Sequence, residues 1–482
     1  MLKKRGDIIK SLPIQPYVAV AAISLVCLGL SFLVFQEPMI LGLIIFSAVG
    51  VYCLLNYFTT TILSLVVFRS SLDIFSSQGI PALFAIGMIA IMILYAACKI
   101  LLGESLQLDR FWLFLIAWVA VTSIWVVLLP IGGLGLGGAY FSEALREWVR
   151  LFSFAIAYLM VLQLKGRVHP VQFINALFLS LIVPLLMATV QIILPESALP
   201  DFLSLAESYS ELSSASRING TFGHPNAFVT FLVFFTGLAY WKVGYSRQRW
   251  PWLLLVGILF FFIVSTKALV GLVMAVVLIF SINIQKLNPK RMLGAFLLAV
   301  VLIALFASSE FGQERLASLY DTPLLNPEID VSRAIIMRNY TFNSFLWRVT
   351  QWNSMIEAWK DYPILGFGLS TVRHVAVFEN AAHNDYLRAL TEGGIVGLAV
   401  FLTFLGGNML RSIRILFTLP KDSPQHGLCV VVCSTLLAMM VGMLTDNVMS
   451  HTTLFFYFLS VSSLLTWDWG KPTNGEVNLV RE

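Results

Sequence analysis

The stretch IPALFAIGMIAIMILYAACKILL, residues 80–102, contains a single charged side chain, Lys99. A helix needs about 20 consecutive apolar residues to cross the hydrocarbon core of a bilayer, and this stretch meets that length. Comparable runs recur along almost the whole chain, in which 58% of the residues are hydrophobic and 12% are charged. Because soluble domains carry roughly 25% charged residues, the composition excludes an ordinary soluble domain. It predicts an all-α, polytopic membrane helix bundle.

Thirteen apolar runs are candidate spans, so we expect about 12–14 transmembrane helices. The runs lie at residues 17–35, 39–56, 80–102, 111–129, 149–164, 171–194, 225–241, 251–264, 268–284, 292–308, 393–410, 427–446 and 450–467. Two cytoplasmic termini require an even number of spans. Either residues 57–72 therefore make one more short or re-entrant pass, or one of the first candidate runs is not a span.

The expected orientation follows from the Lys and Arg residues, because short basic loops stay on the cytoplasmic side of a membrane. Basic residues gather at 1–10, 164–170, 241–250, 285–291 and 411–421. Counting spans between these loops predicts four parts. They are transmembrane helices with short loops and an outer loop near 195–224 (1–308), a large extracytoplasmic segment containing short helices (309–392), C-terminal transmembrane helices (393–470) and a cytoplasmic tail (471–482). The basic loops account for the net charge of +5, so no nucleic-acid partner is implied.

The stretch AAHNDYLRALTEGG, residues 381–394, places ionisable groups at the edge of an apolar run. Such groups are costly near the hydrocarbon core, so they indicate a site. If the chain is helical from Asn384 onward, His383 stands at the helix start and Arg388 lies one turn after Asn384. An imidazole accepts a proton from a hydroxyl near neutral pH, so His383 is a candidate general base. The competing interpretation is a structural histidine bonded to Asp385 or to the backbone.

Two arginines fall on the same expected outer face. Arg348 lies in SFLWRVTQWNSMIEAWKDYP, residues 344–363, where apolar residues at three- and four-residue spacing predict a helix that Pro363 ends. Arg217 precedes GHPN, which predicts a turn before an apolar span. A planar, always charged guanidinium matches a diphosphate or a carboxylate. The alternatives are that Arg348 only extends to the membrane surface, and that Arg217 pairs with a nearby glutamate, Glu207 or Glu211.

Two further polar groups adjoin expected outer turns. Lys267 lies in the short turn 265–267, where it either adds a third cation to the outer face or extends to the membrane surface. Residues 443–453, MLTDNVMSHTT, contain Asp446, Asn447 and His451, and we interpret them as the polar cap of a helical hairpin.

Two arginines and one base suit the displacement of a diphosphate leaving group by a sugar hydroxyl. The arginines would neutralise the charge that develops on the leaving phosphate, and His383 would deprotonate the hydroxyl. The acidic residues are scattered rather than clustered, so no metal cage is predicted. Two other classes stay open, namely a transporter of anions or lipid-linked sugars and a structural scaffold. Transporters place ionisable groups near the bilayer midplane, whereas most charges here lie at expected outer boundaries.

Three stretches resemble the O-antigen ligase and polymerase superfamily, membrane glycosyltransferases of the GT-C type. They are RINGTFGHPN (217–226), WRVTQWNSMIEAWKDYPILGFG (347–368) and HNDYLRALTEGG (383–394). By position, Arg217 and Arg348 are similar to the family's diphosphate-binding arginines, and His383 is similar to its catalytic histidine. Lys267, Asn384 and Arg388 complete the expected substrate-binding set. Many members have Ser-Arg-Gly around position 267, and the lysine found here cannot bind a phosphate bidentately.

The resemblance implies an undecaprenyl diphosphate-linked glycan donor, a glycan acceptor, surrounding membrane lipids and a metal-independent, inverting transfer without a cofactor. It also implies the bacterial cytoplasmic membrane, with the site facing the periplasm or the cell exterior. A polymerase joins lipid-linked repeat units to one another, whereas a ligase moves the glycan to a lipid A core or another acceptor. We favour a polymerase because RSSLDIF (69–75) is similar to a stretch of exopolysaccharide and capsule polymerases. The large outer segment is also long enough for a second glycan.

Overall fold

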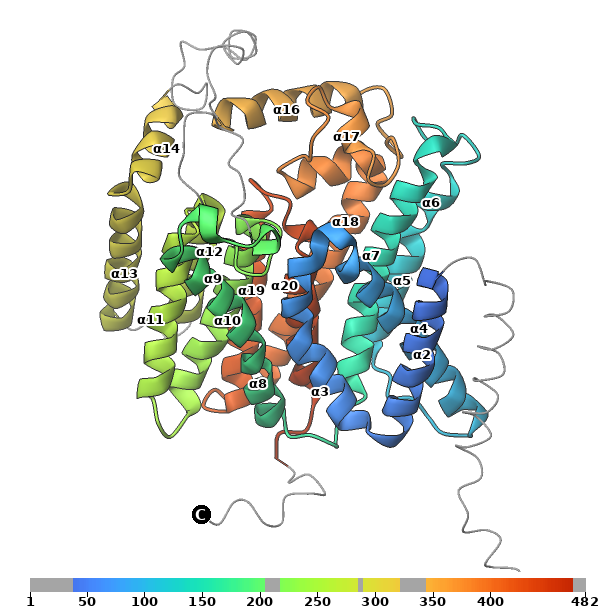
Figure 1. The fold of residues 1–482 in the computed structure, drawn as a ribbon, viewed down its shortest axis with the longest axis horizontal. Coiled ribbons are helices and arrows are strands. Elements are labelled where there is room, and N and C mark those ends of the chain that lie inside the picture. Colours follow the sequence, from blue (N-terminus) through green and yellow to red (C-terminus); the bar gives the residue numbers. More distant parts are fainter. Residues whose placement is uncertain (1–37, 204–216, 285–288, 321–343, 471–482) are drawn as a thin grey trace, which may run out of the picture.

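The computed structural model describes residues 38–203, 217–284, 289–320 and 344–470, and the regular elements in these ranges are all helices (Figure 1). The predicted all-α class is therefore confirmed. The expected span at 17–35, the tail at 471–482 and parts of both outer segments lie outside the described residues.

The α-helices of the described ranges follow one another along the chain. They are α2 (Pro38–Asn56), α3 (Phe58–Phe68), α4 (Ile80–Leu101), α5 (Arg110–Thr122), α6 (Ile124–Val127), α7 (Phe141–Leu162), α8 (Pro170–Phe178), α9 (Ile182–Ile193), α10 (Pro225–Tyr245), α11 (Trp250–Ser265), α12 (Leu269–Ile284), α13 (Pro289–Ala307), α14 (Glu310–Tyr320), α16 (Ser344–Trp359), α17 (Val372–Val375), α18 (Asp385–Thr418), α19 (Pro424–Gly442) and α20 (Thr452–Ser463). Short 3-10 helices connect some of them, including η2 (Arg69–Gln78) and η7 (Val448–Ser450).

Within the described residues, seven helices are long and apolar enough to cross a membrane, and five shorter apolar helices accompany them. A polytopic membrane helix bundle is thereby confirmed, while the expected total of about 12–14 spans stays a prediction. The pass left open at residues 57–72 belongs to one of the seven, Phe58–Ser76, in which α3 continues into η2.

The core of the bundle lies where α7, α10, α19 and α20 pack together. Phe154 of α7 stacks on Phe455 of α20 with ring centroids 4.8 Å apart, and Phe235 of α10 meets Tyr457 of α20 edge to face at 5.6 Å. Aromatic pairs of this geometry add about 0.5–1.5 kcal/mol beyond their buried area. The starts of α10 and α20, which border the site, are therefore held by a rigid interior.

Helix α18 is interrupted at Gly394, where the backbone has φ 63° and ψ −164°. The preceding stretch PILGFG enters this break, and its Pro363 and Ile364 carbonyls accept hydrogen bonds from the N–H groups of residues 395 and 396 at 2.9 and 3.2 Å. A Cβ on Gly394 would lie 2.2 Å from the Ile364 carbonyl oxygen. The close approach of two backbones therefore requires a glycine here. The break lies close to residues 392 and 393, where the sequence predicts the division of the large outer segment from the C-terminal transmembrane helices.

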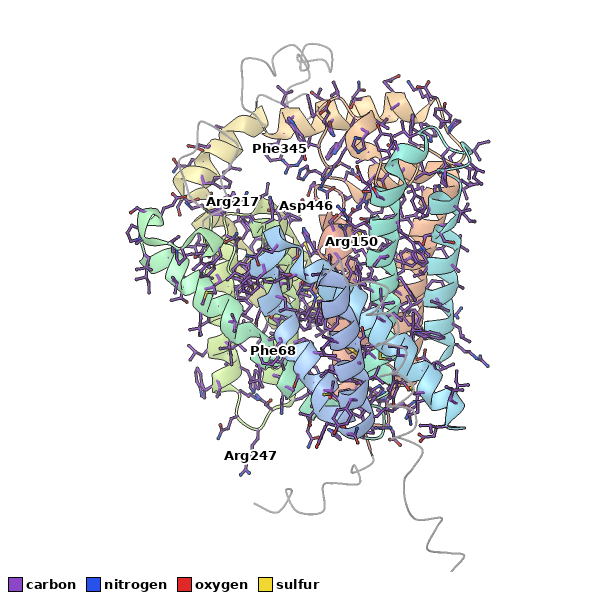
Figure 2. The ribbon with its side chains drawn as sticks, turned by 45° about the vertical axis from the view of Figure 1, so that its right-hand side comes forward. Phe68, Arg150, Arg217, Arg247, Phe345 and Asp446 are labelled. Carbon is purple, nitrogen blue, oxygen red and sulfur yellow. The ribbon has the colours of Figure 1, made fainter. Side chains whose placement is uncertain are left out.

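The two ends of the bundle differ in the groups they carry. Helix α16 lies across one end (Figure 1), and Arg217, Arg150 and Asp446 lie toward this α16 end (Figure 2). Arg247, in one of the basic loops, lies at the opposite end (Figure 2). The separation of Arg217 from the basic loop that contains Arg247 agrees with the two faces expected from the sequence. The side of the membrane that each end faces stays a prediction.

Candidate active site

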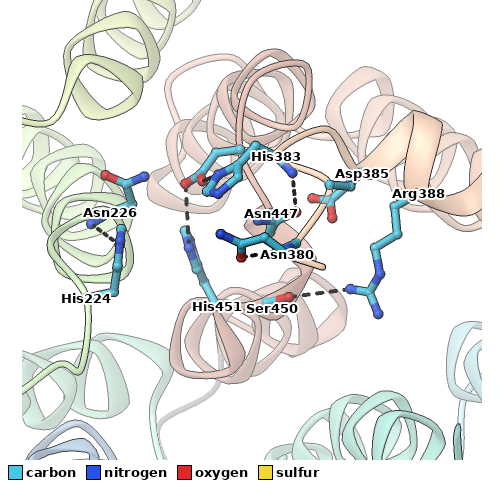
Figure 3. Close-up of polar contacts among 12 residues, drawn as sticks. His224, Asn226, Asn380, His383, Asp385, Arg388, Asn447, Ser450 and His451 are labelled. Atoms are coloured by element: carbon cyan, nitrogen blue, oxygen red, sulfur yellow. Dashed lines mark hydrogen bonds and ion pairs between the residues drawn. The ribbon is translucent and has the colours of Figure 1, made fainter. Parts of the chain in front are cut away.

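The centre of the candidate site is a contact between His383 and Asp446 (Figure 3). His383 Nδ1 lies 3.2 Å from Asp446 Oδ1, and the His383 backbone N–H donates to Asn447 Oδ1 at 2.8 Å. His383 precedes Asn384, whose side chain accepts from the Tyr386 and Leu387 N–H groups and begins α18. The His383 backbone has φ 49°, a left-handed conformation that costs free energy outside glycine and is found more often at functional sites.

The surroundings of Asp446 keep its carboxyl ionised. The residue is 3% exposed, and burial by itself raises the pKa of a carboxyl. The hydrogen bond from His383 and, at the acidic pH where a carboxyl titrates, the positive charges of His451, His383 and His224 outweigh this effect and hold the pKa of Asp446 well below its usual range. An ionised Asp446 accepts a hydrogen bond from the His383 Nδ1–H group, so the lone pair of a neutral His383 lies on Nε2. This is the arrangement that a general base requires.

A second histidine lies on the other side of Asp446. His451 Nε2 is 3.7 Å from Asp446 Oδ2, and His451 Nδ1 is 3.0 Å from Thr230 Oγ1. Because Thr230 Oγ1 donates to the Ala227 carbonyl, it accepts from His451 Nδ1. Burial lowers the pKa of His451, although the Asp446 carboxylate opposes this effect. His451 therefore stays neutral near pH 7, and its hydrogen bond to Thr230 joins the start of α20 to α10.

Arg217 is held by three elements that are distant in sequence. Its Nε donates to the Thr266 carbonyl at 3.2 Å and its Nη2 donates to Asn226 Oδ1 at 3.1 Å. The guanidinium carbon lies 5.6 Å from the centre of the Phe311 ring. The structure thus brings Arg217 to the turn between α11 and α12 that carries Lys267, and a role for Lys267 in binding stays a prediction. Lys267 has φ 51° and is half-buried.

Arg348 lies on α16 and faces the same centre. Burial lowers the pKa of its guanidinium, and the charge of Asp446 opposes this effect. The position of α16 is fixed by two side chains, since Gln351 Nε2 donates to the Asn380 carbonyl at 3.1 Å and Trp352 Nε1 donates to the Ala382 carbonyl at 3.0 Å. The Trp347 ring meets the His383 ring edge to face, with centroids 5.4 Å apart.

The expected site residues divide into two groups. In the first group, His224 interacts electrostatically with Arg217, His383 and Asp446. Arg348 interacts electrostatically with Asp446. Arg388 instead forms ion pairs with Glu147 at 2.9 Å and Glu392 at 3.2 Å, on the other side of His383 from Asn226 (Figure 3). The side chain of Asn384 is used as a helix cap, so a role for it in binding stays a prediction.

Sequence reasoning missed the contacts of Asp446 and His451 with the start of α18 and with each other, because we expected these residues to be only the polar cap of a hairpin. Asp446 does lie in the turn after α19, as expected of such a cap, but its carboxylate points to the start of α18. The signal that identified His383, an ionisable group retained beside an apolar run, applies equally to Asp446.

Residues 253–402 match the family model of the O-antigen ligases. The matched part contains Lys267, Arg348 and His383, whereas Arg217 and Asp446 lie outside it. No curated protein matches the chain. The match confirms the resemblance to the O-antigen ligase and polymerase superfamily that the sequence motifs indicated.

Proposed function

We propose that this multi-pass membrane protein, which contains an O-antigen ligase domain, polymerises undecaprenyl diphosphate-linked repeat units into a cell-surface polysaccharide. The observation that carries this proposal is the His383–Asp446 contact beside Arg217 and Arg348. The site would face the periplasm or cell exterior from the bacterial cytoplasmic membrane. The alternative within the same chemistry is an O-antigen ligase that transfers the glycan to a lipid A core or another acceptor.

The reaction begins with the acceptor hydroxyl. His383 Nε2 takes the hydroxyl proton while Asp446 holds Nδ1–H and stabilises the imidazolium that forms. The acceptor oxygen forms a bond to the anomeric carbon of the donor, and the bond from this carbon to the diphosphate oxygen breaks. The leaving diphosphate takes the electron pair. Attack from the face opposite the leaving group inverts the anomeric configuration.

The two arginines would stabilise the departing diphosphate. Guanidinium groups donate parallel hydrogen bonds to phosphate oxygens, and such interactions gain strength where water is excluded. Lys267, beside the Thr266 carbonyl that holds Arg217, would add a point charge. Removing a single preorganised donor of this kind typically costs about 10²–10³-fold in rate.

The test uses purified protein and lipid-linked repeat units alone. A polymerase produces a ladder of longer lipid-linked glycans, and His383→Ala abolishes the ladder while donor binding is kept. Transfer only after addition of a core acceptor would identify a ligase instead. Passage of the substrate across a vesicle membrane without any new glycosidic bond would identify a transporter and refute the proposal.

A further inference from the structure

We propose that a cavity next to His383 binds the acceptor glycan, and that it holds the hydroxyl-rich oligosaccharide of the acceptor rather than a diphosphate. This inference rests on the proposed glycosyl transfer. The cavity, of about 570 Å³, lies between the first half of α7, residues 370–382 and the start of α18. Its volume falls within the range of roughly 300–1,000 Å³ that is usual for sites of small molecules.

The wall of the cavity is continuous with the candidate active site. Ala381, Ala382 and Asn447 line it, and these residues precede His383 or follow Asp446 in the chain. The Asn447 side chain also accepts the hydrogen bond from the His383 backbone. A glycan in the cavity can therefore present a terminal hydroxyl to the base. Arg217, which would bind the donor diphosphate, lies elsewhere, beside the turn between α11 and α12.

The charges of the lining separate a glycan from a diphosphate as the occupant. Four arginines and four glutamates line the cavity, so their formal charges cancel. They are Arg146, Arg150, Arg373, Arg388, Glu143, Glu147, Glu379 and Glu392. Because the charges cancel, the lining offers a diphosphate no net positive charge. Sugar hydroxyls both donate and accept, so they bond to carboxylates and to guanidinium groups alike.

Part of this lining is a buried ion-pair network. Arg388 is 13% exposed and contacts Glu147 and Glu392, each 5% exposed, and Arg150 contacts Glu147 at 2.7 Å. Buried ion pairs of this kind are weak evidence of stability, because desolvation of the charges offsets their attraction. Arg388 also reaches Ser450 Oγ at 3.4 Å, beside the His451 that contacts Asp446. The network provides fixed donors and acceptors at one side of the cavity.

The other wall carries strained backbone. Ser370 and Glu379, which line the cavity, have φ 66° and 49°, and His383 at its end has φ 49°. Left-handed backbone at non-glycine residues persists only where the surrounding structure imposes it, and it gathers at ligand sites. Glu392 fixes this wall, because its Oε1 accepts from the Val372 N–H at 3.3 Å.

The test measures the equilibrium binding of a free, unphosphorylated oligosaccharide repeat unit of the host polysaccharide. Wild-type protein should bind it, and inorganic pyrophosphate should not displace it. The variant Arg373→Gln/Glu379→Gln changes two exposed residues of the cavity mouth and should weaken binding about tenfold. Lys360→Gln, which changes an exposed cation just after α16 and outside the cavity, is the matched control and should bind as wild type does.

A kinetic measurement distinguishes this inference from the proposed function. In the double variant, the KM for the acceptor should rise while the KM for the lipid-linked donor stays unchanged. Displacement of the oligosaccharide by pyrophosphate, a raised donor KM or unchanged binding in the double variant would overturn the inference. Binding of the oligosaccharide by a wild-type protein that transfers no glycan would refute the proposed function and leave the glycan cavity supported.

Discussion

Replacement of Asp446 by asparagine tests the role of the carboxylate behind His383. The substitution keeps the shape of a residue that is 3% exposed, but it removes the charge 3.2 Å from His383 Nδ1. An amide can also donate to Nδ1, which would turn the imidazole proton toward Nε2 and block the base. General-base catalysis contributes about 10²–10⁴-fold, so we expect kcat to fall by this factor, equivalent to about 3–5 kcal/mol of barrier.

The assay is a single-turnover transfer with pre-bound lipid-linked donor, in which the chemical step is measured directly. Donor affinity should stay within about threefold of wild type, and Asp446→Glu should restore part of the rate, since it returns the charge. Asp361→Asn, at an exposed turn after α16, is the matched control and should leave the rate unchanged. A rate for Asp446→Asn within threefold of wild type, in a folded protein, would refute the reasoning.

Three further predictions follow from the same contacts. Arg348→Lys keeps the charge but loses the bidentate geometry, so donor affinity should fall about tenfold, whereas Arg247→Lys at the opposite end (Figure 2) should have no effect; equal donor affinity in both variants would contradict this. Gly394→Ala places a Cβ 2.2 Å from a carbonyl oxygen at positive φ and should lower the free energy of unfolding by at least about 1–3 kcal/mol. Gly257→Ala, where a Cβ meets nothing within 4 Å, is its control in the same thermal melt. The lowered pKa of His451 in the folded state means that the unfolded chain binds the proton more readily, so stability is complete above about pH 6.5 and is lost as the pH falls. His451→Gln should reduce the slope of the melting temperature between pH 7 and 5, and an unchanged slope would count against a neutral His451.

Helices whose ends depend on neighbouring residues were predictable from the sequence. The spacing of Trp352 and Met355, with Pro363 beyond them, predicted the helix that the structure shows as α16, and the Asn384 cap begins α18 where the polar stretch indicated. Contacts between distant residues were not predictable in this way. The pairing of Asp446 with His383 depends on how the turn after α19 packs against the start of α18. The pairing of Arg388 with Glu147 likewise depends on the packing of α7 against α18.

The break in α18 is a second feature that the sequence did not predict. Two adjacent glycines at the membrane edge are compatible with a continuous helix, so the sequence does not predict the break. In the structure, the Gly368 N–H donates to the Glu392 carbonyl at 2.9 Å and the Phe367 N–H donates to the Thr391 carbonyl at 3.2 Å. This packing orients Glu392, which lines the proposed acceptor cavity. A sequence pattern cannot show which backbone segment occupies such a break.

The most direct test of the account is an experimental structure of the protein with a lipid-linked donor and a free acceptor oligosaccharide bound. The account predicts that the guanidinium groups of Arg217 and Arg348 both contact the diphosphate. It also predicts that the acceptor hydroxyl lies about 2.6–3.2 Å from His383 Nε2. A diphosphate held in the cavity beside Arg388, or at the end of the bundle that carries Arg247, would contradict it.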